Sequence, residues 1–269
     1  MCHRPIGIDY FPNLIEAFNV PRRNSFHIPR KMSEDQYDTL MRLLYLSMKV
    51  FYDNDIEYTV SAGGLIGSYV MHDMLPWDDD MDILINEKHM RKVVELFKDD
   101  RHYGIQGYQN KNQPGSVVKL FFTSSPSTSK YNWRWPFLDI ESYIEEGDQI
   151  KLADRSDRNV SWSRDSYFPF HRRPFGPLWL NFPRDPKGYL RAHYLHHFKC
   201  KTQHWDHEKE KLQPRLEVDC DLLAPHYPFV KRTPFANITK ETLVLNETEL
   251  YTIYIDEPYK ETEYELGWW

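Results

Sequence analysis

The sequence predicts an α/β fold in which a small mixed β-sheet is flanked by helices. Two segments, 34–53 and 87–98, carry apolar residues at the spacing of one helical face. Two others, 81–85 and 136–143, alternate acidic with apolar residues, which is typical of strands that bury one face. With 269 residues, the chain is long enough for one large domain with a substantial core.

The order of the remaining elements follows from local signals. Ser33 and Gln36 form a capping-box pattern at the start of the first helix. Asp185 and Pro186 are typical of an N-cap and first turn, so another helix is expected from there. Further strands are expected at 56–61, 103–108, 117–122 and 250–255, a helix at 65–73 and a loop at 123–130.

We expect three parts along the chain. Residues 1–32 are rich in Pro, Arg and Asn and predict an irregular lead-in. Residues 33–213 hold the regular elements and form the main domain. Residues 214–269 begin Pro-rich, become strand-like, and are expected to pack on that domain as a C-terminal extension.

Composition excludes several classes of protein. The net charge of −6 argues against a nucleic-acid partner, because phosphate backbones demand basic surfaces. No apolar run is long enough to span a membrane, and no apolar segment follows residues 1–5 as a secretory signal would require. Three cysteines do not make a disulfide framework, although one Cys200–Cys220 bridge is allowed.

The most informative feature is a pair of acids two residues apart on a predicted strand. Asp80 and Asp82 project from one face, whereas Met81 and Ile83 point into the core. Two such charges about 4 Å apart repel by roughly 4 kcal/mol at an effective dielectric constant near 20. A solvated acidic turn is the alternative, but the apolar neighbours favour a magnesium site that handles a phosphorylated substrate.

Two more features complete this constellation. Gly63 and Gly64 follow a predicted strand, and a turn without side chains lets backbone N–H groups approach an anion. Asp139 lies on the second acidic strand and would complete a three-carboxylate cluster. It is expected to act as a further metal ligand or as the general base toward an attacking hydroxyl.

These motifs resemble the LicD family, which includes the fukutin-related proteins and has a nucleotidyltransferase fold. The resemblance rests on GGLIGS at 63–68 and PWDDDMDI at 76–83, and it covers residues 62–83 without a gap. A helix with Tyr189, Leu190 and Tyr194 is similar to a later landmark of the family. The resemblance therefore implies a nucleotidyltransferase-like mixed sheet flanked by helices, with a C-terminal extension.

The resemblance also implies a reaction. Family members transfer a phosphorylated small alcohol, such as phosphocholine or ribitol phosphate, from a CDP-linked donor to a glycan or glycoprotein. By this likeness, Asp80, Asp82 and Asp139 are the catalytic acids and the ligands of Mg²⁺, with Mn²⁺ as an alternative. The expected substrate- and nucleotide-binding residues are Gly63, Gly64, Ser68, Lys119 and Trp77. The family also suggests the Golgi or secretory lumen, although the sequence alone leaves the cytosol open.

The chain departs from the family pattern at two positions. Val70 stands where the family often has Arg, and Leu195 stands where it has Gly. Lys119, which lies among apolar residues, is a candidate to supply the missing charge, with an edge-strand lysine as the alternative. Trp77 is a candidate for ring stacking, with core packing as the alternative.

Three rival functions share some of these residues. A nucleotidyltransferase would use the same acids but transfer the nucleotide itself. A glycosyltransferase with an acidic metal motif would consume a nucleotide sugar, which the glycine pair argues against. A glycan-binding pseudoenzyme would explain Val70, but the intact acids oppose it.

Other motifs carry weaker hypotheses. Residues 171–173 (His-Arg-Arg) would hold a pyrophosphate or form a surface basic cluster. A set of His and Cys residues would bind zinc or mark a polar helix end; its members are His196, His197, Cys200, His204, His207 and Cys220. Glycosylation sequons begin at Asn159, Asn237 and Asn246 and favour a secretory lumen.

Overall fold

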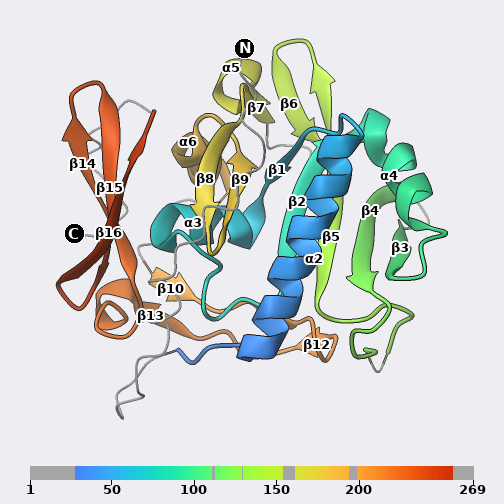
Figure 1. Ribbon diagram of the computed structural model, residues 1–269, viewed down its shortest axis with the longest axis horizontal. Helices are drawn as coiled ribbons and strands as arrows, with labels where there is room; N and C mark the ends of the chain where they lie inside the picture. Colours follow the sequence, from blue (N-terminus) through green and yellow to red (C-terminus); the bar gives the residue numbers. More distant parts are fainter. Residues whose placement is uncertain (1–27, 111–112, 129, 154–160, 194–198, 257–269) are drawn as a thin grey trace.

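A mixed α/β architecture is seen in the computed structural model, which describes residues 28–110, 113–128, 130–153, 161–193 and 199–256. Its main sheet has seven strands (Figure 1). The path runs β1 (Tyr58–Val60), β2 (Met81–Asn86), β5 (Phe137–Glu146), β4 (Gln113–Phe122) and β3 (Tyr103–Asn110), with β6 (Gln149–Leu152) on β5 and β7 (Ser161–Ser163) on β6. Because β2 and β5 are parallel and the other pairs antiparallel, the predicted mixed sheet is confirmed.

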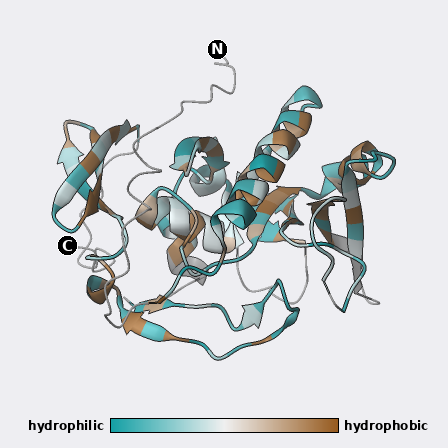
Figure 2. Ribbon diagram, turned by 60° about the horizontal axis from the view of Figure 1, so that its bottom comes forward, coloured by the Kyte–Doolittle hydropathy of each residue, from teal (hydrophilic) through white to brown (hydrophobic). Residues whose placement is uncertain are grey.

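Helix α2 (Glu34–Asp53) covers the sheet, as its apolar spacing predicts (Figure 1). Its capping box is formed, because Ser33 and Gln36 each accept a backbone N–H from the other's residue. Figure 2 shows hydrophobic and hydrophilic bands alternating along this helix. The hydrophobic bands form its buried face, which comprises Leu40, Met41, Leu43, Leu44, Met48 and Phe51.

The helices that follow lie where the sequence predicts them, but their first and last residues differ from the predicted bounds. Helix α3 (Ala62–Met71) begins three residues before the predicted 65–73 segment. The predicted helix 87–98 consists of a 3₁₀ turn, η1 (Glu87–His89), followed by α4 (Met90–Phe97). None of the helices in the described ranges is both long and apolar enough to cross a membrane.

Short ribbons complete the middle of the chain. Helix α5 (Arg164–Tyr167) leads into the hairpin β8 (His171–Phe175) and β9 (Leu178–Phe182), and α6 (Pro186–His193) follows as predicted from Asp185. The landmark residues Tyr194 and Leu195 lie outside the described residues. Beyond them come β10 (Lys199–Lys201) with β13 (Glu217–Asp219), β11 (Trp205–Asp206) with β12 (Lys211–Leu212), and η3 (Cys220–Leu222).

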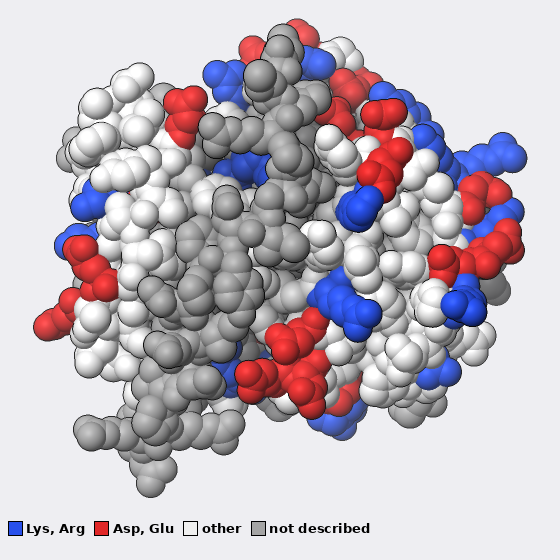
Figure 3. Space-filling model, in the orientation of Figure 1, with Lys and Arg blue, Asp and Glu red and all other residues white. Residues whose placement is uncertain are grey.

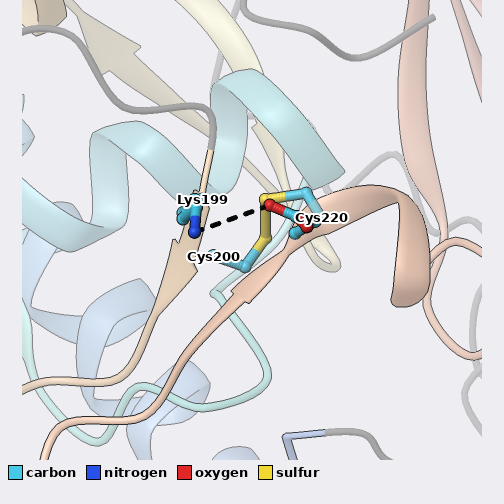
Figure 4. The surroundings of a disulfide bond; sticks show 4 residues. Lys199, Cys200 and Cys220 are labelled. Carbon is cyan, nitrogen blue, oxygen red and sulfur yellow. Dashed lines mark ion pairs between the residues drawn. A yellow bond between two sulfur atoms is a disulfide. The ribbon is translucent and has the colours of Figure 1, made fainter.

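A disulfide closes the segment between these ribbons. Cys200 on β10 and Cys220 beside β13 are bonded to each other, with Cα atoms 5.1 Å apart (Figure 4). The one bridge that the sequence allowed is therefore formed. It uses both thiols of the proposed zinc set, of which His196 and His197 lie outside the described residues, so the structure brings no zinc site with cysteine ligands together.

The chain ends in a separate three-stranded antiparallel sheet, made of β14 (Phe229–Phe235), β15 (Ile238–Leu245) and β16 (Thr248–Ile255). It confirms the strand expected at 250–255. The division of the chain at residue 214 stays a prediction, although β13, beyond that residue, pairs with β10 before it.

A buried carboxylate anchors this C-terminal sheet to the main domain. Glu241 on β15 accepts hydrogen bonds from Arg173 Nη2 at 2.6 and 2.8 Å, from Arg232 Nε at 2.8 Å and from His72 Nε2 at 2.7 Å. Burial alone would raise the pKa of Glu241, but the two arginines and His72 outweigh it and hold that pKa well below its usual range.

For Arg173, the hypothesis of a pyrophosphate site at residues 171–173 and its alternative of a surface basic cluster are both wrong. For the exposed Arg172, both stay predictions. The side chain of Arg173 is fully buried on Glu241, and Arg172 donates to the carbonyl of Trp179. The pattern was ambiguous because the acidic partner lies on a strand far along the chain.

Candidate active site

The acid pair lies where two parallel strands begin. Asp80 directly precedes β2 and Asp82 lies within it, while Met81 and Ile83 are fully buried on the other face, as the alternation predicts. Asp139 lies near the start of β5. One carboxylate oxygen from each acid lies within 4.8 Å of the others, so the structure brings the three predicted acids together.

The strand register explains this grouping. Asp82 on β2 pairs with Asp139 on β5, and Asp139 pairs in turn with Lys119 on β4. Residues that pair across neighbouring strands point to the same face of the sheet, so the three side chains lie next to one another. Lys119 Nζ lies 2.7 Å from both carboxylate oxygens of Asp139 and 3.7 Å from the centre of the Phe137 ring.

Burial concentrates negative charge at this cluster. Asp78, Asp80 and Asp139 are 3, 7 and 9 % exposed. Burial raises the pKa of Asp80, and it raises the pKa of Asp82 and of Asp78 well above their usual range; repulsion from Asp80 adds to the last two shifts. A divalent cation would offset the same unfavourable charge, so these shifts and an affinity for cations have one physical origin.

The donor set fits such a cation. Three carboxylates supply hard oxygen ligands, which Mg²⁺ and Mn²⁺ accept. Only Lys119 among the three strands contributes a compensating charge, and it is paired with Asp139 rather than with Asp80 or Asp82. Asp80, Asp82 and Asp139 are therefore the residues that would hold the metal.

Sequence reasoning missed the part of the site that comes from the 200–220 segment. Gln203 Nε2 donates to Asp80 Oδ1 at 2.8 Å and also to Asp78. His207 Nδ1 lies 2.8 Å from Asp79 Oδ1, and its Nε2 lies 3.2 Å from Asp80 Oδ2. Burial opposes the charged form of His207, but Asp80 and Asp79 outweigh it and raise its pKa.

Lys31 was also missed, since it lies in the expected lead-in. Its ammonium group lies 2.8 Å from Asp206 and 3.7 Å from Asp79. The Asp206 pKa is lowered, because hydrogen bonds from Lys31 and Lys209 outweigh the effect of burial. No local pattern could have linked residues 31, 79 and 206, although His207 was already noted as a candidate ligand of another kind.

The glycine pair takes a different conformation from the expected turn. Gly63 and Gly64 lie in the first turn of α3, whose N-cap is Ser61. A Cβ at Gly63 would lie 2.2 Å from Asp78 Oδ2, and one at Gly64 would lie 2.7 Å from Met81 Sδ. Both glycines thus allow the acidic segment to pack against the helix, and the anion that approaches Gly63 is the chain's own Asp78.

Other predicted binding residues lie in the core. Ser68 is fully buried and donates to the carbonyl of Pro174 at 2.8 Å. Trp77 is 4 % exposed and packs edge-on against Tyr227. Val70, which replaces the family's arginine, is also buried. The structure does not bring Ser68 or Trp77 into contact with the acids, and their burial indicates a structural role; substrate binding by them stays a prediction.

One comparison matches the part of the chain that carries the three acids. The family model described as "LicD/FKTN/FKRP, nucleotidyltransferase domain" matches residues 55–185. This segment is a LicD-family domain. The LicD family consists in general of metal-dependent transferases, and the LicD domain of this chain contains Asp80, Asp82, Lys119 and Asp139. Gln203 and His207 lie beyond the match.

A more distant relative spans a larger part of the chain. An uncharacterised protein of Rickettsia typhi is 23 % identical over 233 residues, which is 82 % of this chain and 69 % of that protein. The likeness therefore continues beyond the LicD domain. It adds no information about substrate.

Proposed function

We propose that this protein is a magnesium-dependent phosphotransferase, built on a nucleotidyltransferase-type fold, with Mn²⁺ as an alternative metal. It moves a phospho-alditol or phosphocholine group from a CDP-linked donor to a glycan hydroxyl. The observation that supports this most is the level alignment of Asp82, Asp139 and Lys119 across three strands, with Asp80 beside them. The LicD-family match supports the same class of reaction.

Each of these residues has a separate role in an in-line displacement at phosphorus. The glycan hydroxyl oxygen bonds to the phosphorus distal to cytidine, the bridging P–O bond breaks, and CMP leaves with the electron pair. Asp139 accepts the hydroxyl proton, and Lys119 holds that carboxylate in position. Asp80, Asp82 and Asp139 would hold the cation, which would supply charge neutralisation for the donor phosphates.

The proposed compartment is the secretory lumen. A disulfide such as Cys200–Cys220 persists in oxidising compartments. Asn237 and Asn246 are exposed at the two hairpin turns of the C-terminal sheet, which is where a surface glycan would be attached. Asn159 lies outside the described residues.

The experiment starts with donor binding. The melting temperature is measured with CDP-alditols, CDP-choline and nucleotide sugars, each with and without Mg²⁺, because a ligand that prefers the folded state raises it. A magnesium-dependent rise with one CDP-linked compound supports the proposal and names the donor. No rise with any nucleotide, from a folded sample, favours the pseudoenzyme instead.

Product analysis and one variant then test the chemistry. CMP release supports phosphotransfer, whereas pyrophosphate release from a nucleoside triphosphate identifies a nucleotidyltransferase. Asp80→Asn should lower turnover at least about a hundredfold, since charge neutralisation contributes several kcal/mol. Its metal-free melting temperature should equal or exceed that of the unmodified protein, because a buried like charge is removed. Asp99→Asn, at an exposed position, is the control; full activity of Asp80→Asn would refute the metal assignment.

A further inference from the structure

The disulfide-closed segment 200–220 brings one imidazole to the acids. His207 follows β11, and its side chain is 13 % exposed. Its ring lies edge-on to Phe137 on β5, with ring centres 5.8 Å apart. Figure 4 shows the bridge that ties the two ends of this segment together. The imidazole is thus held between the sheet and a covalently closed loop.

Asp79 fixes the orientation of this ring. One carboxylate oxygen of Asp79 lies 2.8 Å from His207 Nδ1, and the other accepts the backbone N–H of His207 at 3.1 Å. Because an ionised carboxylate only accepts hydrogen bonds, Nδ1 carries a proton. The other ring nitrogen, Nε2, then faces Asp80 Oδ2 at 3.2 Å, and a proton or a metal cation between the two atoms would relieve the repulsion of their lone pairs.

We propose that His207 Nε2 is a nitrogen ligand of the cation held by Asp80, with Asp79 as the residue that orients it; this inference rests on the proposed metal centre. A carboxylate that accepts the second ring N–H is the usual partner of a metal-binding histidine. Asp79, Asp80 and His207 each offer one donor atom within 4.8 Å of the others. Gln203 supports the arrangement by donating to the other oxygen of Asp80.

This ligand changes which cation the site prefers. Mg²⁺ favours an all-oxygen shell, whereas Mn²⁺, a first-row transition metal, also accepts a nitrogen ligand beside its carboxylates. A centre in which His207 joins Asp80 should therefore bind Mn²⁺ more tightly than Mg²⁺. Removing His207 should reduce that preference, because the remaining ligands are all oxygens.

The test uses Mn²⁺ alone, with no donor or acceptor. Calorimetry gives the affinity, and pulsed electron paramagnetic resonance of the bound Mn²⁺ reports coupling to a ¹⁴N nucleus. We expect this coupling in the unmodified protein and its loss in His207→Ala, together with at least about tenfold weaker binding. Asp79→Asn should weaken binding by a similar factor. His204→Ala, an exposed histidine in the same segment, should change neither.

Each outcome decides one point. If the unmodified protein binds no Mn²⁺, the proposed metal centre fails and the inference fails with it. If Mn²⁺ binds without nitrogen coupling, or His207→Ala binds it equally well, only the role of His207 is refuted. A lowered melting temperature identifies a misfolded variant. In that case, the nitrogen coupling measured in the unmodified protein decides whether a nitrogen ligand is bound to Mn²⁺.

Discussion

At the residue scale, the candidate site is defined by an excess of carboxylates over positively charged side chains. Asp80, Asp82 and Asp139 gather within one cluster, and Lys119 is the cation on the neighbouring strand. The resemblance suggested an arginine at position 70, but Val70 is buried on α3. That Lys119 supplies the corresponding positive charge from β4 stays a prediction.

Replacing this lysine should separate its structural role from its proposed catalytic role. Lys119→Met removes one partner of a buried pair, which typically costs about 3–5 kcal/mol of unfolding free energy. Because Mg²⁺ or Mn²⁺ would compensate Asp139, the loss measured by urea unfolding should be smaller with the cation than without it. Turnover should fall about a hundredfold or more, the scale of losing one group that stabilises developing charge.

The matched control is Lys49→Met, which breaks an exposed i, i+4 pair with Asp53. Such an exposed pair is screened by solvent and contributes little, so stability and turnover should be nearly unchanged. Equal destabilisation of Lys119→Met with and without divalent cation would contradict a shared role for lysine and metal at Asp139.

At the element scale, the C-terminal sheet is attached through one acid on β15. Glu241 joins Arg173 on β8, Arg232 on β14 and His72 at the end of α3. His72 also accepts a hydrogen bond at Nδ1 from the hydroxyl of Tyr251 on β16, at 2.8 Å, because its Nε2 proton serves Glu241. Burial lowers the pKa of His72, so the network favours the neutral imidazole.

This network should make stability depend on pH in a defined direction. The pKa values of His72 and Glu241 are both lower in the folded state, so the unfolded state binds more protons as the pH falls. The free energy of unfolding should therefore decrease below about pH 6.5 through His72 and further below about pH 4.3 through Glu241. Urea unfolding at a series of pH values measures both steps.

Glu241→Gln tests the second step. The variant should lose about 3–5 kcal/mol at neutral pH, because Arg173 stays buried without this carboxylate. Its stability should also lack the decrease below about pH 4.3 that Glu241 causes. Glu247→Gln, at the exposed turn between β15 and β16, is the control. An unchanged acid profile in Glu241→Gln would show that other groups dominate.

At the scale of the whole molecule, two links join segments that lie outside the LicD domain in the sequence. The Cys200–Cys220 bridge closes the segment that carries Gln203 and His207, and Tyr227 donates to the carbonyl of Ile28 at 2.7 Å. On the face shown in Figure 3, basic and acidic side chains are interspersed. The acids of the site are mostly buried. Lys31, before the LicD domain, contacts Asp79, and Gln203 and His207, beyond it, contact Asp80.

Breaking the bridge should therefore affect both stability and the site. Cys200→Ser with Cys220→Ser should cost about 3 kcal/mol of unfolding free energy, the scale expected for a loop of this size. Mn²⁺ binding should weaken as well, because Gln203 and His207 lose their covalent anchor. Thermal unfolding with and without reductant measures the first effect, and calorimetry the second. Cys2→Ser is the control, and a melting temperature that reductant leaves unchanged would contradict the prediction.

The sequence by itself determined the parts whose signals are local. Helical spacing predicted α2 and α4, and alternation predicted β2 and β5, because each pattern matches the period of its own backbone. The acid pair was predicted for the same reason. Its closeness to Asp139 was predicted from the second acidic strand and from the family resemblance, and the strand register accounts for it.

Only the tertiary structure decided which distant residues complete the site. Gln203 and His207 are more than a hundred residues from Asp80, and no period in the sequence links them. The glycine pair was predicted to form a turn but lies in a helix. The reason for two glycines there is their packing against Asp78 and Met81, which the local sequence does not reveal. Local backbone preferences determine which helices and strands form. Charge pairing and close packing in the folded state determine which distant residues lie beside each other.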